Sequence, residues 1–327
     1  MTSIASALDG ALELAVVPSF TKIGYLVRRR LFHWSDLDRY WLRDRVIAIT
    51  GATSGLGRAA AEQLARDGAT VIALGRDAAK TERVIGELRS RTGNDRVRSV
   101  LVDLADQESV RDAAARILAE HDRLDGLIHS AGALTNERRT VSDGTELTVA
   151  SQVVGPFLLT SLLLNRLKAS APARVITVSS GGMYTAALTV DALSMDASSY
   201  DGSQQYAKAK RAQVTLNELW AERFPDRSIV FHAMHPGWAD TPGVEASLPM
   251  FHRVVGPLLR DPLEGADTMV WLAADDGMPL ATSGGFWLDR RTRPIHRLRK
   301  TARSDTPERR EELWRWAVSA TGIDPGS

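Results

Sequence analysis

Two patterns of apolar residues alternate along this chain from Arg45 onward. Short apolar runs rich in β-branched residues predict buried strands, and stretches with an apolar residue every three or four positions predict helices. The predicted strands are Val46–Thr50, Thr70–Leu74, Val97–Val102, Gly126–His129, Arg174–Ser179, Ile229–His235 and Gly285–Leu288. The predicted helices are Arg58–Asp67, Asp77–Thr92, Asp106–His121, Thr145–Lys168, Gln205–Phe224 and Leu263–Ala274. This alternation predicts an α/β fold with a doubly wound, parallel, seven-stranded Rossmann sheet in one domain.

The predicted domain covers residues 45–289, and an extension flanks it on each side. Residues 1–44 predict a helical arm whose apolar stripe is interrupted by Asp9 and Glu13 and ended by Pro18. This stripe is too short and too charged to span a bilayer. The arm either packs on protein or, because aromatic and basic residues follow it, makes a peripheral contact with a membrane. Residues 290–327 predict a basic tail, either solvated or packed on the protein, and a final helix that starts at Thr306–Pro307.

The amino-acid composition excludes several kinds of chemistry but does not identify a binding partner. The 327 residues are 44% hydrophobic, enough for a substantial core, and the net charge of +1 gives no reason to expect nucleic acid. The absence of cysteine excludes disulfides and thiolate catalysis, and is compatible with a cytoplasmic location. The seven histidines show no metal-ligand spacing, so no metal site is expected.

A glycine-rich turn joins the first predicted strand to the first predicted helix. Its small residues expose backbone N–H groups at a helix N-terminus, which favours a phosphate. We therefore predict that the pyrophosphate of a dinucleotide binds here, although the spacing departs from G-x-G-x-x-G and an ordinary turn is the alternative. The predicted contacts are Gly51, Thr53, Ser54, Gly55, Leu56 and Gly57.

The ends of the next strands predict the rest of the cofactor site. The second strand ends in Gly75 followed by Arg76, where an NAD enzyme usually has a carboxylate. A guanidinium suits a 2′-phosphate, so NADP is favoured over NAD, with an incidental surface arginine as the alternative. Asp103 and Leu104 end the third strand near the expected adenine, and the small residues Ser130, Ala131 and Gly132 let the backbone approach the cofactor.

The candidate catalytic residues lie after the fifth strand and on the helix beyond it. Tyr206 and Lys210 are four residues apart, hence on one helix face. An ammonium beside a phenol should lower the phenol pKa, so that Tyr206 exchanges a proton with a substrate oxygen while hydride moves to or from a nicotinamide. Lys210 would also bind the nicotinamide ribose, and Ser180 would hydrogen-bond the same substrate oxygen. Alone, this spacing is weak evidence, because a packed tyrosine and a solvated lysine produce it too.

Taken together, these motifs resemble those of the short-chain dehydrogenase/reductase family. The resemblance covers about Arg45 to Asp289. Within the family, this sequence is most similar in its motifs to the subgroup of dehydrogenase/reductase member twelve and the retinol dehydrogenases. It implies the catalytic roles given above for Ser180, Tyr206 and Lys210. It also implies that Pro236, Gly237 and Thr241 line the nicotinamide, and that the protein is a homo-oligomer.

One departure from the family affects the catalytic prediction. Where the family has an asparagine that completes a tetrad, this chain has Gln152, which keeps the amide but is one carbon longer. The residues therefore leave three functions open: an NADP-dependent oxidoreductase, a cofactor-binding protein with weak catalysis and a regulatory role, and a membrane-associated lipid carrier.

The segment of about 238–262 is the predicted substrate lid. Its apolar residues favour a lipid-, steroid- or retinoid-like alcohol or carbonyl compound, although packing on the protein or on a partner is an equal alternative. These residues are Trp238, Leu248, Pro249, Met250, Phe251, Val254, Val255, Leu258 and Leu259.

Overall fold

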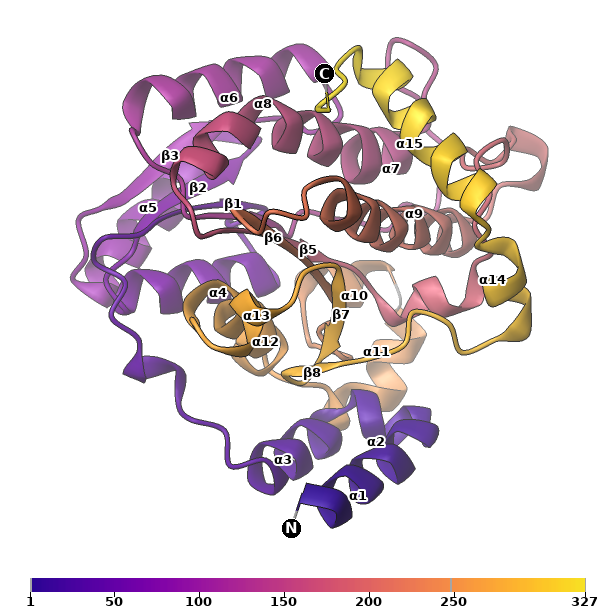
Figure 1. The fold of residues 1–327 in the computed structure, drawn as a ribbon, viewed down its shortest axis with the longest axis horizontal. Helices are drawn as coiled ribbons and strands as arrows, with labels where there is room; N and C mark the ends of the chain where they lie inside the picture. The colour runs from indigo at the N-terminus through magenta and orange to yellow at the C-terminus, as the bar shows by residue number, and fades with distance from the viewer. Residues whose placement is uncertain (1, 248, 327) are drawn as a thin grey trace.

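The computed structural model describes residues 2–247 and 249–326 as one sheet with helices on both faces (Figure 1). The order of the strands is β3-β2-β1-β4-β5-β6-β7-β8, parallel except for β8. The strands are β1 (Val46–Thr50), β2 (Thr70–Gly75), β3 (Val97–Leu101), β4 (Gly126–His129), β5 (Ala173–Val178), β6 (Ile229–Met234), β7 (Gly285–Leu288) and β8 (Arg291–Thr292). The predicted parallel α/β sheet is confirmed. Its eighth strand was missed because two residues are too few to show an alternating pattern.

The helices cover both faces of this sheet, and the arm of α1–α3 lies at one end of the molecule (Figure 1). One buried cluster lies between the sheet and α6, α8, α9 and α15, and the other lies between the sheet and α4, α5 and α12. The helices are α1 (Thr2–Leu14), α2 (Val16–Phe20), α3 (Lys22–Leu31), α4 (Gly55–Arg66), α5 (Ala78–Thr92), α6 (Gln107–Glu120), α7 (Leu147–Val149), α8 (Gly155–Ala169), α9 (Gly202–Arg223), α10 (Pro242–Ser247), α11 (Pro249–Val255), α12 (Pro262–Ala274), α13 (Met278–Ala281), α14 (Arg299–Ser304) and α15 (Pro307–Thr321).

The chain reverses the direction of strand addition between β1 and β4, which lie side by side. Ligands of doubly wound sheets bind at such a point, beyond the carboxyl ends of the strands. Here the Thr50 hydroxyl accepts hydrogen bonds from the backbone N–H groups of Ser130 and Ala131, each at 3.1 Å. These bonds hold the glycine turn after β1 against the small-residue turn after β4.

The predicted continuous helix over 145–168 is interrupted. A π-helical turn, Ala150–Val154, separates α7 from α8. Pro156 explains the interruption: it has no N–H to donate to the carbonyl of Gln152, four residues earlier. Leu147–Ala169 is the one described helical stretch long and apolar enough to cross a membrane, and 78% of its apolar window is buried inside the protein.

Both terminal extensions pack on the domain. In the arm, α1 ends at Leu14, so the expected end at Pro18 is wrong, and Pro18 instead lies within α2. At the other end, Thr306 caps α15 as expected, and Trp314 packs against Phe157 and Trp220. The helix α15 therefore lies on α8 and α9. The homo-oligomer stays a prediction.

Candidate active site

A cavity of about 450 Å³ opens beside the carboxyl ends of β1, β4 and β5. It brings together three parts of the predicted site: the glycine turn, the turn after β4, and the Ser180, Tyr206 and Lys210 side chains. Its lining residues are Gly51, Ser54, Gly55, Leu56, Gly57, Ser130, Ala131, Gly132, Ala133, Leu134, Val178, Ser179, Ser180, Gly182, Ser203, Tyr206, Lys210, Pro236, Gly237, Trp238, Ala239, Thr241, Pro242, Gly243, Val244, Ser247 and Phe251.

The glycine turn has the geometry of a phosphate-binding turn. Helix α4 begins at Gly55, earlier than predicted, and Ser54 at its N-cap makes no side-chain hydrogen bond to the first turn. Gly51 has a φ of 71°, and a Cβ on Gly57 would lie 2.4 Å from the Gly51 carbonyl oxygen. Only glycine fits these positions, and the residues of the first helical turn, whose N–H groups have no helical acceptor, line the cavity. The turn therefore fits the pyrophosphate of a dinucleotide.

Tyr206 and Lys210 lie one turn apart on α9, at the wall of the cavity. The Ser180 hydroxyl lies close enough to the Tyr206 hydroxyl to lower its pKa, and it accepts a hydrogen bond from the Gly182 N–H at 3.2 Å. The Lys210 ammonium nitrogen lies 5.3 Å from the centre of the Tyr206 ring and donates a hydrogen bond to the Val178 carbonyl at 2.9 Å. The hydroxyls of Ser180 and Tyr206 and the amine of Lys210 thus line the same part of the cavity, an arrangement that suits proton exchange with a substrate oxygen.

The expected direction of the Tyr206 pKa is wrong for this structure. Burial raises the pKa of Tyr206 to about 12, against a lowering by the neighbouring Ser180 hydroxyl. Burial also lowers the pKa of Lys210 to about 7. The sequence argument counted the attraction between ammonium and phenolate but not the cost of removing both charges from water. At neutral pH the Tyr206 phenol is therefore protonated and neutral, whereas the Lys210 amine is close to its pKa and only partly protonated.

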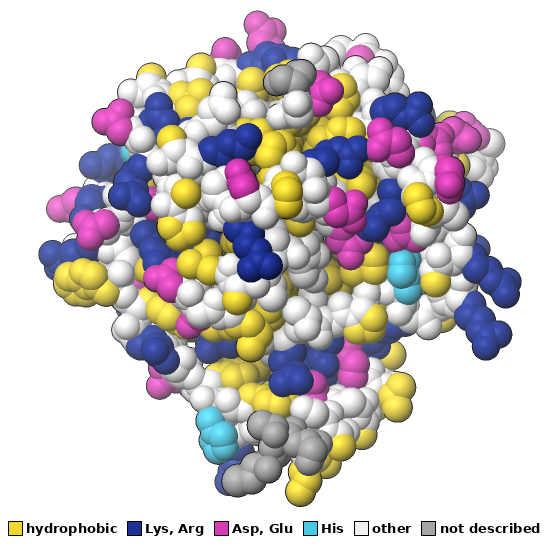
Figure 2. Space-filling view, in the orientation of Figure 1, with side chains coloured by type: hydrophobic (Ala, Val, Ile, Leu, Met, Phe, Trp, Pro, Cys, Tyr) yellow, Lys and Arg dark blue, Asp and Glu magenta, His cyan; other side chains and the backbone are white. Residues whose placement is uncertain are grey.

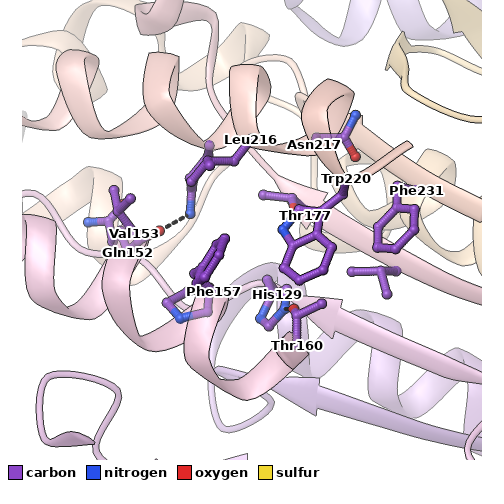
Figure 3. Close-up of a pocket in the computed structure, with 13 residues that line it drawn as sticks. His129, Gln152, Val153, Phe157, Thr160, Thr177, Leu216, Asn217, Trp220 and Phe231 are labelled. Atoms are coloured by element: carbon purple, nitrogen blue, oxygen red, sulfur yellow. Dashed lines mark hydrogen bonds between the residues drawn. The ribbon is translucent and has the colours of Figure 1, made fainter. Parts of the chain in front are cut away.

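Gln152 lies beside this pair, in the π-helical turn before α8, and is 1% exposed. Its side-chain amide donates to the Ala133 carbonyl at 2.7 Å. A Cβ on Gly132 would lie 3.2 Å from both Gln152 Oε1 and Lys210 Nζ, so these two atoms flank the same glycine. Because Pro156 leaves the Gln152 carbonyl free, the side-chain amide of Gln213 donates to it at 2.5 Å (Figure 3). Gln152 thereby links the turn that lines the cavity to helix α9.

A second, small cavity of about 30 Å³ lies behind Gln152 (Figure 3). His129 and Thr160 line it on one side, with Asn217 and Trp220 on the other. His129 Nε2 is 2.8 Å from the Thr160 hydroxyl, and burial lowers the pKa of His129 to about 3. His129 is therefore neutral in this interior and adds no charge to the catalytic pair.

The predicted lid forms the outer wall of the main cavity through α10 and α11. Trp238, Val244 and Phe251 line it, and the rings of Trp238 and Phe251 pack edge to face at 5.1 Å. Met250 and Val254 instead point to solvent, with 69% and 71% of their surfaces exposed. Leu248 lies outside the described residues. One face of the lid is thus an apolar wall of the cavity.

Four predicted cofactor contacts do not line the cavity. Arg76 and Asp103 are exposed, and the Asp103 carboxylate accepts from the Ala105 N–H at 3.0 Å. Leu104 is buried in the core, and Thr53 lies against Gly75, where a Cβ would come within 2.9 Å of its methyl group. The contacts of these residues with a cofactor stay predictions.

The cavity also contains residues that the sequence argument missed. Val178, Ser179 and Gly182 flank Ser180, and Ala133 and Leu134 extend the turn after β4. Their position next to predicted residues could have indicated them. Ser203, near the start of α9, had no such signal, because the loop before it is irregular.

Comparisons with known proteins agree with this geometry. The family model described as short chain dehydrogenase matches residues 45–250. The chain is 39% identical over 294 residues to "Dehydrogenase/reductase SDR family member 12" of Homo sapiens, covering 90% of this chain and 91% of that protein. It is 35% identical over 288 residues to "Retinol dehydrogenase 12" of Homo sapiens, covering 86% of this chain and 88% of that protein.

A solved structure shares the fold. A short chain dehydrogenase from Escherichia coli CFT073 complexed with NADPH superimposes with a TM-score of 0.62 at 26% identity, covering 79% of this chain and 100% of that one. The glycine turn, the Ser180–Tyr206–Lys210 group and these matches lead to one conclusion: the chain belongs to the short chain dehydrogenase family of nicotinamide-dependent oxidoreductases.

Proposed function

We propose that this protein is an NADP(H)-dependent oxidoreductase that interconverts an alcohol and a carbonyl group on an apolar small molecule. The observation that carries the proposal is the shared cavity, which contains the glycine turn, the side chains of Ser180, Tyr206 and Lys210, and an apolar lid. A bound nicotinamide would supply or accept the hydride. The protein supplies the proton and the position of the substrate.

In the direction of reduction, the Tyr206 phenol donates its proton to the oxygen of the substrate. The Ser180 hydroxyl hydrogen-bonds the same oxygen and holds it next to the phenol. The Lys210 ammonium stabilises the phenolate that remains, because its nitrogen lies 5.3 Å from the ring. In the direction of oxidation the same groups act in reverse.

The preference for NADP over NAD rests on the end of β2. A Cβ on Gly75 would lie 2.4 Å from the Thr81 hydroxyl, so this position has no room for the carboxylate that would contact the ribose hydroxyls of NAD. Arg76 follows it and is exposed, where a 2′-phosphate could pair with it.

The apolar class of substrate rests on the lid. Leu134, Trp238, Val244 and Phe251 line the cavity together with Ser180. A site lined in this way favours a ligand that is mostly apolar and carries few polar groups. We therefore propose lipid-, steroid- or retinoid-like alcohols and ketones or aldehydes as the class to screen.

The decisive experiment measures NADPH oxidation against retinoid, steroid and aromatic carbonyl compounds. Turnover of one of these classes supports the proposal, and faster turnover with NADH overturns the preference for NADP. The rival function is a cofactor-binding protein with weak catalysis, motivated by Gln152. Tight NADPH binding without turnover of any compound would support that rival.

We also propose that the arm contacts an anionic membrane surface. Asp9 and Glu13 face inward, where they pair with Arg28 of the arm and with Arg293 of the C-terminal extension, whereas Leu14 and Val17 are 88% and 52% exposed. Hydrophobic side chains accordingly lie at the lower right edge of the molecule in Figure 2, whereas a histidine and a basic side chain lie at the lower left. Among described residues 4–31 the exposed charged side chains are all basic, namely Lys22, Arg29 and Arg30, and Arg29 pairs with the exposed Asp36. Such a surface suits anionic lipid.

A flotation assay with anionic liposomes tests the membrane contact. The intact chain should float, and Leu14→Glu should reduce flotation. Equal flotation of both, or none by the intact chain, would reject the contact while leaving the oxidoreductase proposal unaffected.

A further inference from the structure

The N-terminal arm contacts the back of the active-site wall. We propose that Phe20 and Arg28 are positioning residues of the reaction. They lie outside the cavity and fix the position of the segment 236–238 and of Gly181, which follows Ser180. The inference rests on the proposed function, because it assigns these residues to the end of the cavity where the nicotinamide would react. Both residues lie outside residues 45–250, the part matched by the family model.

The first support is the backbone of Phe20. Its carbonyl oxygen accepts a hydrogen bond from the Trp238 N–H at 2.7 Å and another from Arg260 Nε at 3.1 Å. Gly237 has a φ of 73°, and a Cβ there would lie 2.6 Å from the same carbonyl oxygen and 2.5 Å from Arg260 Cζ. The arm and Arg260 thus pack directly against the backbone of a segment whose other side lines the cavity.

The second support is the ring of Phe20, which is 4% exposed. A Cβ on Gly181 would lie 2.9 Å from this ring, so the ring packs against the backbone that follows Ser180. The ring also meets His235 edge to face at 4.5 Å. One side chain of the arm therefore contacts both segments that carry the reacting end of the cavity.

The third support is an ion network that fixes the arm in this place. Arg28 is fully buried and pairs with Asp9 at 2.7 Å, with Glu13 at 2.7 Å and with Asp289 at 2.6 Å. Asp289 in turn accepts from Arg260 at 2.5 and 2.9 Å, and the two arginines hold its pKa below the ordinary value against the effect of burial.

Arg260 completes the connection to the cavity wall. Its guanidinium donates to the Pro236 carbonyl at 3.2 Å. A continuous series of buried charge-assisted bonds therefore runs from α3 through Asp289 and Arg260 to the segment that lines the cavity. Removal of one partner leaves buried charges with fewer partners and loosens the series.

The arm also provides its own control. Arg28, Arg29 and Arg30 are consecutive on α3, but successive helical residues point about 100° apart. Arg28 is therefore buried in the network, whereas Arg29 is exposed and pairs with the exposed Asp36. Arg29→Met changes the same chemistry on the same helix without contact with the cavity wall.

The first measurement is hydrogen–deuterium exchange of the full chain without cofactor. We expect faster exchange of the Trp238 amide in Arg28→Met than in Arg29→Met, because the Phe20 carbonyl is its acceptor. In Phe20→Leu, which keeps an apolar side chain and both ion-paired arginines, we expect a smaller increase. Should Arg28→Met fail to fold, Phe20→Leu carries the test. Exchange at Trp238 unchanged in the folded variants would overturn the inference.

The second measurement separates positioning from general destabilisation. NADPH and adenosine 2′,5′-bisphosphate, which lacks the nicotinamide half, are titrated into each variant. We expect weaker binding of NADPH, unchanged binding of the bisphosphate, and a loss of up to about 100-fold in kcat, as small displacements of reacting groups cause. An equal loss for both ligands would indicate global loosening and overturn the inference. If the wild type binds neither ligand, the proposed function fails, and the exchange measurement still decides the role of the arm.

Discussion

The two ends of the proposed cofactor site differ in how the protein holds its functional side chains. At the reacting end, Lys210 and Gln152 are 2% and 1% exposed, and each donates a hydrogen bond to a backbone carbonyl. At the adenosine end, Arg76 and Asp103 are exposed. Burial makes electrostatic interactions strong and removal of a partner costly, whereas exposed charges are screened by water. We therefore expect substitutions to lose most at the reacting end and least at the adenosine end.

The largest effect is expected for Tyr206→Phe, which removes the proton donor and keeps the ring. Its kcat should fall by about 10²- to 10⁴-fold, the usual contribution of a general acid. The dissociation constant of NADPH should change little, because the phenol acts on the substrate oxygen. Stopped-flow kinetics and cofactor titration measure the two quantities.

Tyr40→Phe is the control for this substitution. The Tyr40 hydroxyl bonds Asp275 at 2.9 Å, and Tyr40 is not among the residues that line the cavity. Its variant should retain the wild-type kcat. Full activity of Tyr206→Phe would show that catalysis at the reacting end does not depend on the phenol. The expected difference between the reacting end and the adenosine end would then be wrong.

The pH dependence of reduction should report Lys210. With its pKa lowered to about 7, the ammonium loses its proton as the pH rises through neutrality, while Tyr206, at about 12, remains a phenol. Loss of the cation destabilises the phenolate that forms on proton transfer. We therefore expect kcat/KM for reduction to be constant below pH 7 and to fall about tenfold per unit above it.

Lys210→Met checks the assignment of this break. The variant should be slow at all pH values and show no break near neutrality. A break that persists in the variant would assign the titration to another group.

An intermediate effect is expected for Gln152→Asn. The shorter side chain should lose the bond to the Ala133 carbonyl, and one buried hydrogen bond corresponds to roughly tenfold in kcat. Gln204→Asn, an exposed change on α9, is the matched control and should have no effect. A rise in kcat would mean that glutamine weakens this site, and would favour the rival function of a cofactor-binding protein with weak catalysis.

The sequence predicted the sheet and most of the cavity because local patterns encode both. Strand periodicity gave seven strands, and a glycine turn and a tyrosine–lysine pair one helical turn apart are readable from spacing alone. The direction of the Tyr206 pKa was not readable, because it depends on burial by segments distant in the chain. The contact of Phe20 with Gly181 could not be predicted for the same reason, because 161 positions separate the two residues (181 − 20). Asp9 and Glu13 looked like interruptions of an apolar stripe until their partner Arg28 was placed beside them.

The smallest effect is expected at the adenosine end, for Arg76→Ala. Because Arg76 is exposed, its pairing with a 2′-phosphate is screened, and an exposed ion pair contributes about 0.2–1 kcal/mol. The KM for NADPH should therefore rise by roughly 1.4- to fivefold, with kcat and the KM for NADH unchanged. Arg58→Ala, which removes an arginine paired with Glu87 on the neighbouring helix, controls for the loss of one positive charge. A much larger rise for Arg76→Ala would mean that the adenosine end closes over the cofactor and becomes buried, so that the two ends would resemble each other once the cofactor is bound.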